Sequence, residues 1–233
     1  MIMLQHGMLS LTFRMILLMV GASLAGCAGG HGPEFNFMLG YSHVEQDSSG
    51  PFEPFVDDQG GARVSLGMDG PVAVVDDNGS GPRLGGRVAI SGYRDNIGDR
   101  VVAGEPLLEI EEFVDLALFT PQFVASYRQV IGDVEAGGAF IEPGVGLGLT
   151  IATLSFGSNL EFGDGPIGTD IDEQETEVGL AVNPFLRGGY TRGSLVIGVE
   201  GGYQWASLEF DDDLGADPAE WYIGVFFGVQ LGG

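Results

Sequence analysis

Ser42 and His43 are the residues of the chain whose types come closest to a catalytic pair. With a carboxylate they could form a hydrolase or an acyltransferase site. The two residues are adjacent, however, and neighbouring side chains of an extended strand point to opposite faces. No glycine elbow and no second histidine in a strand supports such a site. We therefore predict a non-enzymatic protein, with a lipid-modifying enzyme that uses His43 as an alternative.

Acidic clusters are the second set of candidate ligands. Two of them, Asp164–Glu175 and Glu209–Asp217, could attract divalent cations, but neither has the spacing of an EF-hand. A zinc site is not expected, because the chain has one cysteine and no paired histidines. We predict no cofactor and no resident metal, and leave divalent cations open as partners of these segments.

Charged residues at alternate positions of apolar stretches form the third set. They are Arg63, Arg87, Arg128, Glu142, Arg187 and Glu200. A buried isolated charge costs several kcal/mol unless it is paired. If these side chains share one interior, they must therefore neutralise each other as arginine–glutamate pairs.

The stretch 139–156 shows which element carries such residues. Ile141, Val145, Leu147, Leu149 and Ile151 form one apolar row, whereas the alternate row holds glycines, a threonine and Glu142. A period of two predicts an extended strand with two different faces. A wall with an apolar outer side and a small, polar inner side is typical of a membrane-spanning β-barrel.

Seven further stretches alternate in the same way, so the chain is predicted to form eight strands of about the length that a tilted strand needs to cross a bilayer. The predicted strands cover 35–44, 62–75, 83–93, 119–128, 139–156, 178–187, 195–205 and 221–231. Long polar connections follow the first, third, fifth and seventh strands, at 45–61, 95–112, 158–176 and 209–220. Shorter turns follow the others, among them a tight turn at 191–194. The fold class predicted is an all-β, eight-stranded antiparallel up-and-down transmembrane β-barrel, with both termini on the short-turn, periplasmic side.

An eight-stranded barrel has an interior that side chains can fill. Strand direction places four of the inward charges in the periplasmic half and Glu200 somewhat higher. We therefore predict a polar network that plugs the lower lumen, formed by Arg87, Arg128, Glu142, Arg187 and Glu200. A gate or narrow ion path built from the same residues is the functional alternative.

Aromatic residues and prolines add two expectations. Tyr127 and Tyr190 fall at the short-turn ends and Trp205 and Trp221 at the opposite ends, as the interfacial aromatic residues of a barrel do. Three prolines fall inside strands, where each removes a ladder hydrogen bond, so we expect local bulges at Pro121, Pro143 and Pro184.

The N-terminus predicts export. The apolar run 15–25 follows Arg14 and ends in Leu24-Ala25-Gly26-Cys27, which is similar to a bacterial lipobox. Either Cys27 is acylated or an ordinary signal peptidase removes the leader. The predicted division is a signal peptide over 1–27, a periplasmic linker over 28–34 and a barrel over 35–233.

Composition agrees with an exported β protein and excludes one class of partner. The chain of 233 residues has 41 glycines, no lysine and a formal net charge of −24. A chain this acidic would repel a phosphate backbone, so nucleic-acid binding is not expected. Its expected partners are outer-membrane lipids, and we expect a monomer.

The strings FIEPGVGLGL, NPFLRGGY and WYIGVFFGVQLGG, with the exported leader, resemble the small outer-membrane β-barrels of the opacity-protein and outer-membrane-protein-A/X type. The resemblance covers about 35–233 and implies a porin-like barrel in a Gram-negative-type outer membrane. Two features depart from it, namely the lipobox and an end at Leu231-Gly232-Gly233 without a terminal aromatic residue. A soluble, lipocalin-like lipoprotein barrel with its apolar rows inward is a further alternative.

Overall fold

The structure is a computed structural model that describes residues 32–48, 59–72, 79–101, 108–133, 137–162, 165–210 and 214–231. The leader, Cys27 and most of the predicted linker therefore lie outside the described residues. Within these ranges, no helix is long and apolar enough to span a membrane.

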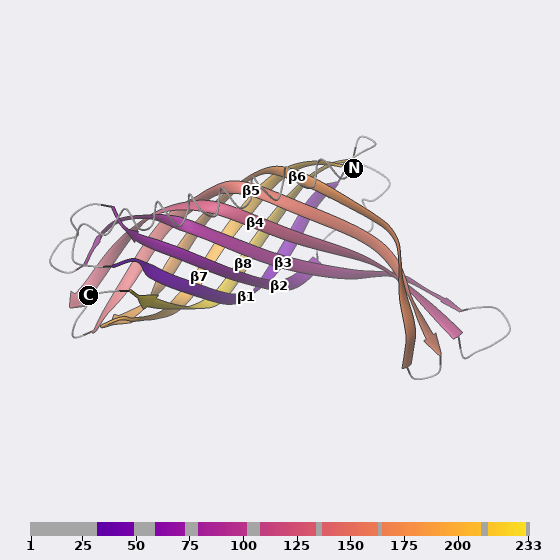
Figure 1. Ribbon diagram of the computed structural model, residues 1–233, viewed down its shortest axis with the longest axis horizontal. Coiled ribbons are helices and arrows are strands. Elements are labelled where there is room, and N and C mark those ends of the chain that lie inside the picture. Colours follow the sequence, from indigo (N-terminus) through magenta and orange to yellow (C-terminus); the bar gives the residue numbers. More distant parts are fainter. Residues whose placement is uncertain are drawn as a thin grey trace.

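Eight antiparallel strands form one closed barrel in which each strand pairs with its neighbours in the sequence and β1 pairs with β8 (Figure 1). The strands are β1 (Glu34–Ser48), β2 (Gln59–Pro71), β3 (Gly81–Val101), β4 (Leu108–Asp133), β5 (Gly137–Phe162), β6 (Gly165–Arg192), β7 (Leu195–Phe210) and β8 (Leu214–Gln230). The predicted up-and-down barrel of eight strands is confirmed.

The register fixes how the strands are inclined. Followed once around the barrel, it leads from Glu34 through Asp69, Gly85, Val124, Gly146, Asn183, Gln204 and Glu220 to Val44, ten residues further along β1 (44 − 34 = 10). For eight strands, such a shear corresponds to a tilt of about 40° from the barrel axis.

The strands are longer than predicted at the end opposite Glu34 and Gln230. Segments expected to be long acidic loops, 95–112, 158–176 and 209–220, belong largely to strands, and their connections shrink to 102–107, 163–164 and 211–213. The prediction ended each strand where its apolar row ended, but a hydrogen-bonded ladder can continue into water with polar residues on its outer face. The four longest strands, β3 to β6, project beyond the others (Figure 1).

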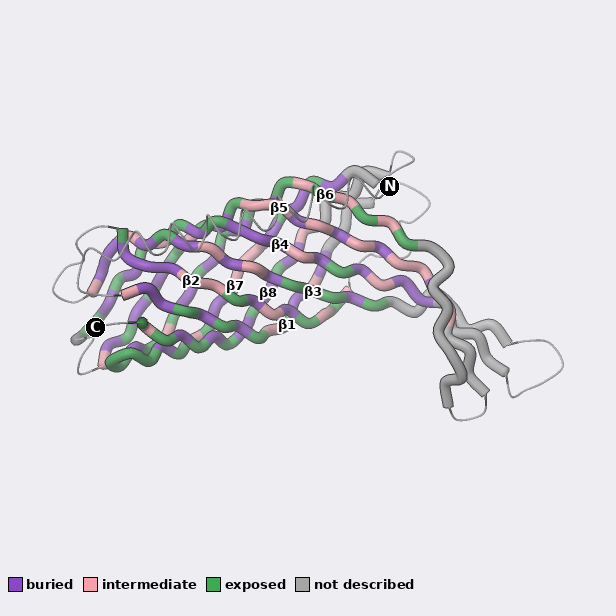
Figure 2. Tube along the Cα trace, in the orientation of Figure 1, coloured by how far each residue is buried: buried purple, intermediate pink, exposed green. Residues whose placement is uncertain are grey.

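The turn predicted at 191–194 is confirmed and is confined to Gly193 and Ser194, which join β6 to β7 directly. Gly193 occupies it with φ 57°, a left-handed conformation that suits glycine. Burial alternates along the barrel wall, with buried and exposed residues taking turns on each strand (Figure 2).

The expected bulges at Pro121, Pro143 and Pro184 are wrong. Among the described pairings, the register shifts only near Asn96–Gly98, Phe156–Gly157 and Leu160–Glu161. Each proline instead coincides with a two-residue gap in one of its two ladders, after which the same register resumes. A proline lacks one N–H, so a strand can omit one bond to one neighbour without inserting a residue.

At Pro184 a side chain replaces the missing backbone donor. Tyr203 lies opposite Pro184 on the register of β6 and β7, and its carbonyl oxygen accepts a hydrogen bond of 3.2 Å from Asn183 Nδ2. The carbonyl group of Tyr203 thereby accepts a side-chain hydrogen bond at the position where Pro184 has no backbone N–H to donate.

A double-mutant cycle can measure how far the side chain of Asn183 compensates for the N–H that Pro184 lacks. Pro184→Ala restores a backbone N–H opposite Tyr203, so Asn183→Ala should cost about 0.5–1.5 kcal/mol less in that background than in the wild type. Urea unfolding of the four proteins in the same lipid measures the difference. Equal losses in both backgrounds would show that the amide of Asn183 does not compensate for Pro184.

Candidate functional site: the charged lumen

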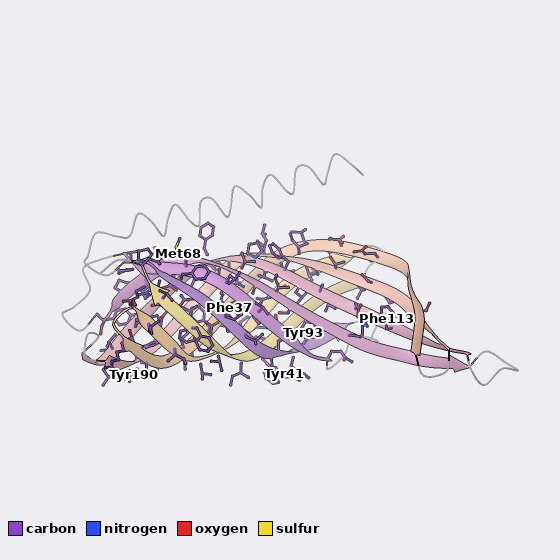
Figure 3. All side chains as sticks on the ribbon, turned by 60° about the horizontal axis from the view of Figure 1, so that its bottom comes forward. Phe37, Tyr41, Met68, Tyr93, Phe113 and Tyr190 are labelled. Carbon is purple, nitrogen blue, oxygen red and sulfur yellow. The ribbon has the colours of Figure 1, made fainter. Side chains whose placement is uncertain are left out.

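The outer face of the barrel wall is apolar. Its large exposed side chains come from all eight strands and include Leu39, Leu66, Ile90, Leu147 and Phe227, each about half exposed. The soluble, lipocalin-like alternative is wrong, since it requires these rows to face inward. Tyr190 lies at the short-turn end, and Phe113 lies towards the end where the long strands project (Figure 3).

Among the described residues, the inner face holds ten buried charged side chains, five basic and five acidic. They are Arg63, Arg83, Arg87, Arg128 and Arg187 with Glu34, Asp69, Glu142, Glu200 and Glu220, all at most 5% exposed. We call them the lumen network. Its formal charge is zero, so the whole surplus of −24 lies outside it (33 − 5 acidic residues against 9 − 5 basic residues).

Arg128 and Glu142 form the centre of one part of the network. Arg128 Nε donates to Glu142 Oε2 at 2.6 Å, and its Nη1 donates to Glu34 Oε2 at 2.6 Å. Glu142 also accepts from Ser126 Oγ at 2.8 Å and from Arg187 Nη1 at 3.2 Å. Glu34 thereby ties the start of β1 to β4 across the lumen.

Arg83 and Asp69 extend this part of the network to β3 and β2. Arg83 Nε donates to Asp69 Oδ1 at 2.6 Å, and Arg83 Nη2 lies 3.4 Å from Glu34 Oε2. The other oxygen of Asp69 accepts from Asn36 at 2.8 Å and from Arg187 at 3.2 Å.

Glu200 joins two arginines. Its Oε2 accepts from Arg187 Nε at 2.5 Å, and its Oε1 accepts from Arg87 Nη1 and from the Tyr222 hydroxyl. Arg87 also donates to the side chains of Gln122 and Asn183. A buried carboxylate with three charged or polar donors is fully compensated, which is the condition for keeping it ionised in a barrel.

Arg63 and Glu220 form the pair furthest along the lumen from Glu34. Arg63 Nη1 donates to Glu220 Oε2 at 2.5 Å, and Ser91 Oγ donates to the other oxygen of Glu220 at 2.6 Å. Gln204 accepts from Arg63 at 3.0 Å and from Gln122 at 3.0 Å, which connects this pair to the rest of the network.

Aromatic rings and glycines shape the space around the charges. The guanidinium groups of Arg63 and Arg128 lie 4.1 Å and 4.4 Å from the ring centres of Tyr222 and Phe140. A Cβ at Gly146 would come within 2.5 Å of Gln122 Oε1, and one at Gly228 within 2.6 Å of Asn36 Oδ1. The small residues of the inner rows therefore leave room for long polar side chains from other strands.

The structure brings together the five residues expected in the lumen, Arg87, Arg128, Glu142, Arg187 and Glu200, through direct contacts. It adds partners that the sequence analysis missed: Glu34, Asp69, Arg83 and Glu220. Glu34 was assigned to the linker and Glu220 to an acidic loop. Glu34 lies two positions from the inward Asn36, and Glu220 lies two positions from the inward Tyr222. This spacing was the available signal that both carboxylates point into the lumen.

The polarity of both faces inverts towards the end where the long strands project. On β4 the inner row changes from Arg128, Gln122 and Thr120 to Leu118, Leu116 and Val114, all buried. The outer row changes from Phe123 and Phe119 to Asp115, whose carboxylate receives two bonds of 2.6 Å from Arg94. Such an inversion is what a wall needs where apolar surroundings give way to water.

The two side chains considered for catalysis, those of Ser42 and His43, lie on opposite faces of β1. Ser42 is buried inside and accepts a hydrogen bond of 2.9 Å from the Tyr93 hydroxyl, whereas the ring of His43 packs beside Trp221, at 5.2 Å between ring centres. Trp221 belongs to the outer row of β8. Across the described ranges, no group of three or more potential ligands is placed to hold a metal ion.

A closed antiparallel barrel with an apolar exterior and a charged, neutral interior belongs, by its fold and polarity, to the class of small eight-stranded β-barrels. Neither a protein-family model nor a curated protein matches the sequence.

Solved structures with a similar fold are eight-stranded outer-membrane barrels. One is Ail, the attachment invasion locus protein of Yersinia pestis, in complex with the heparin analogue sucrose octasulfate (13% identity, 84% of this chain and 98% of that one, TM-score 0.49). Others are Neisserial surface protein A (15%, 84% and 97%, 0.42) and OprG of Pseudomonas aeruginosa (12%, 88% and 99%, 0.44). At these identities the likeness concerns the fold alone.

The lumen network predicts a large difference between buried and exposed ion pairs. Glu220→Gln leaves Arg63 buried without its counter-charge, so it should cost about 3–5 kcal/mol, and the double variant Arg63→Gln/Glu220→Gln should cost less than the single one. In the exposed pair, Asp115→Asn should cost only about 0.2–1 kcal/mol. Denaturant unfolding in one detergent measures all three. Similar losses for Glu220→Gln and Asp115→Asn would contradict a desolvated network.

Proposed function

We propose that this protein is a non-enzymatic barrel of the outer membrane, with a structural or surface-interaction role, a closed lumen and acidic strand ends on the outer side. The observation that carries the proposal is the inverted polarity of the wall, apolar outside and charged inside. In water this arrangement would expose the apolar rows and bury ten charges, whereas in lipid it satisfies both faces.

The dimensions of the apolar belt support a membrane span. Along β7, Leu195 and Trp205 are ten residues apart (205 − 195 = 10), and both side chains are exposed. At about 3.3 Å per residue and a tilt of about 40°, these residues differ in height by about 25 Å, the height of the apolar band of outer-membrane barrels.

Aromatic side chains support the same boundaries. Tyr127 and Tyr190 are half exposed near the short turns, and Trp205 and Trp221 are exposed at the other edge of the belt. Tyr41 and Trp221 lie 5.7 Å apart, and Tyr203 and Trp205 4.5 Å apart, between ring centres. Rings with an apolar body and a polar edge favour the two interfaces of a bilayer.

We further propose that the strand ends beyond the belt meet partners in the medium. The segments that project there are rich in aspartate and glutamate, which favours cationic partners or divalent cations over anionic ones. At the periplasmic side, an acyl group on Cys27 would add a second anchor to the barrel. No residue of the lumen is proposed to catalyse a reaction.

A membrane span predicts that the cost of a charge on the outer face depends on depth. Val225 lies in the middle of the outer row of β8, and Leu231 directly follows the last residue of that strand; both are about half exposed. Val225→Arg should cost about 2–4 kcal/mol and Leu231→Arg about 0–1 kcal/mol in phosphocholine vesicles. Urea unfolding monitored by tryptophan fluorescence measures both. Equal small costs would show that this face does not meet lipid.

A closed lumen predicts that the wild-type protein, inserted into a planar bilayer at neutral pH, gives no steady ionic current above that of a bilayer treated with the same detergent. The reason is that the lumen network occupies the interior with paired side chains. Open, steady and large channels would contradict the plug and favour the alternative of a pore.

A further inference from the structure

The inner wall changes from polar to apolar within one inward position on five strands. The last polar residue and the first apolar one are Ser42 and Val44, Ser91 and Tyr93, Thr120 and Leu118, Thr150 and Ala152, and Gln204 and Ala206. All ten are buried, at 5% exposure or less. The register places these switches at a similar depth on five of the eight strands. We call this level the switch ring, and its five polar residues the polar ring.

Beyond this ring, buried apolar side chains of the described residues form one cluster inside the barrel. Its buried members come from β1, β3, β4, β5 and β7, and they are Val44, Tyr93, Val114, Leu116, Leu118, Ala152, Leu154, Ala206 and Leu208. We call this cluster the apolar plug. Its side chains pack against each other inside the barrel, and Phe156 packs against it.

Hydrogen bonds connect the lumen network to the underside of the plug. Gln204 receives a bond from Arg63 and donates to Thr120 Oγ1 at 3.2 Å, and Thr120 and Thr150 share a hydrogen bond of 3.0 Å. Tyr93 places its ring in the plug and donates its hydroxyl to Ser42 at 2.9 Å. The polar path thus ends at the plug.

We propose that the apolar plug is the outer seal of the lumen and acts in series with the lumen network. An ion or a water molecule arriving from the outer side first meets a packed apolar layer, where a charge loses its hydration and gains no partner. The network below it is therefore shielded from the outer medium. Removing charge pairs from the network alone does not open the lumen from that side.

This inference rests on the proposed closed barrel but makes a separate statement about which layer excludes water. If the network were the only seal, the polar ring beneath the plug would be wet, and neutralising Arg63 and Glu220 would be enough to increase access to it. If the plug is a seal, access to the ring depends on the plug side chains.

Thiol labelling of the full chain distinguishes these cases. Cys27→Ser removes the only native thiol, and Ser42→Cys then places a reporter in the polar ring. The plug is opened by Leu118→Ser/Leu208→Ser, and the network is neutralised by Arg63→Gln/Glu220→Gln. A cationic methanethiosulfonate reagent is applied to each protein folded in detergent micelles, where it reaches the barrel from both ends.

The reporter should react at least about tenfold faster when the plug is opened, and should remain slow when only the network is neutralised. Ser207→Cys, on the exposed outer face beside the plug, should react fast in every background and serves as the matched control. An unchanged, slow rate of labelling at Ser42→Cys in the folded variant with the opened plug would overturn the proposal, because the plug would then not limit access from the outer side.

Folding is checked in the same samples. Each variant should retain the shifted gel migration of a folded barrel before heating, and Leu208→Ala replaces the double serine variant if that protein does not fold. The labelling test uses micelles, whereas the membrane span is tested by Val225→Arg and Leu231→Arg. Failure of one therefore leaves the other result standing.

Discussion

Charge neutrality within the lumen is the constraint on which the barrel depends. Five arginines and five carboxylates are enclosed together, and every one of them has a counter-charge contributed by another strand. Because a lone buried charge is so costly, the strands can close only in a register that joins these partners. The contacts of Glu34 with Arg128 and Arg83 lie beside the seam where β1 meets β8, so closure of the barrel completes the pairing.

The same backbone serves two environments along its length. Around the network the wall is polar inside and apolar outside, and beyond the switch ring it is apolar inside and polar outside. A β-ladder permits this because its hydrogen bonds do not depend on which face is apolar. The hydrophobic effect, applied to opposite faces at the two levels, therefore stabilises one continuous barrel.

Most of the barrel could be predicted from alternation, because the apolar rows of 139–156 and its counterparts mark both the strands and their faces. Strand ends could not, since the alternation weakens where neither lipid nor a fully apolar core enforces it, as at 158–176. The inward positions of Arg87, Arg128 and Glu142 followed from their parity along each strand. Their actual partners depend on the shear, which sequence periodicity does not fix. Bulges at the prolines failed to appear because a ladder can lose one bond and keep its register.

The unequal lengths of the strands leave free borders on the projecting sheet. β6 pairs with β5 down to Gly165, whereas its described pairing with β7 stops at Leu180, so 165–173 has a described ladder on one side only. A border of this kind can template the growth of a sheet from molecule to molecule. The sequence there carries Asp170, Asp172 and Glu173 and no basic residue. Two copies that met along this border would bring like charges together, which keeps neighbouring barrels from joining into a continuous sheet.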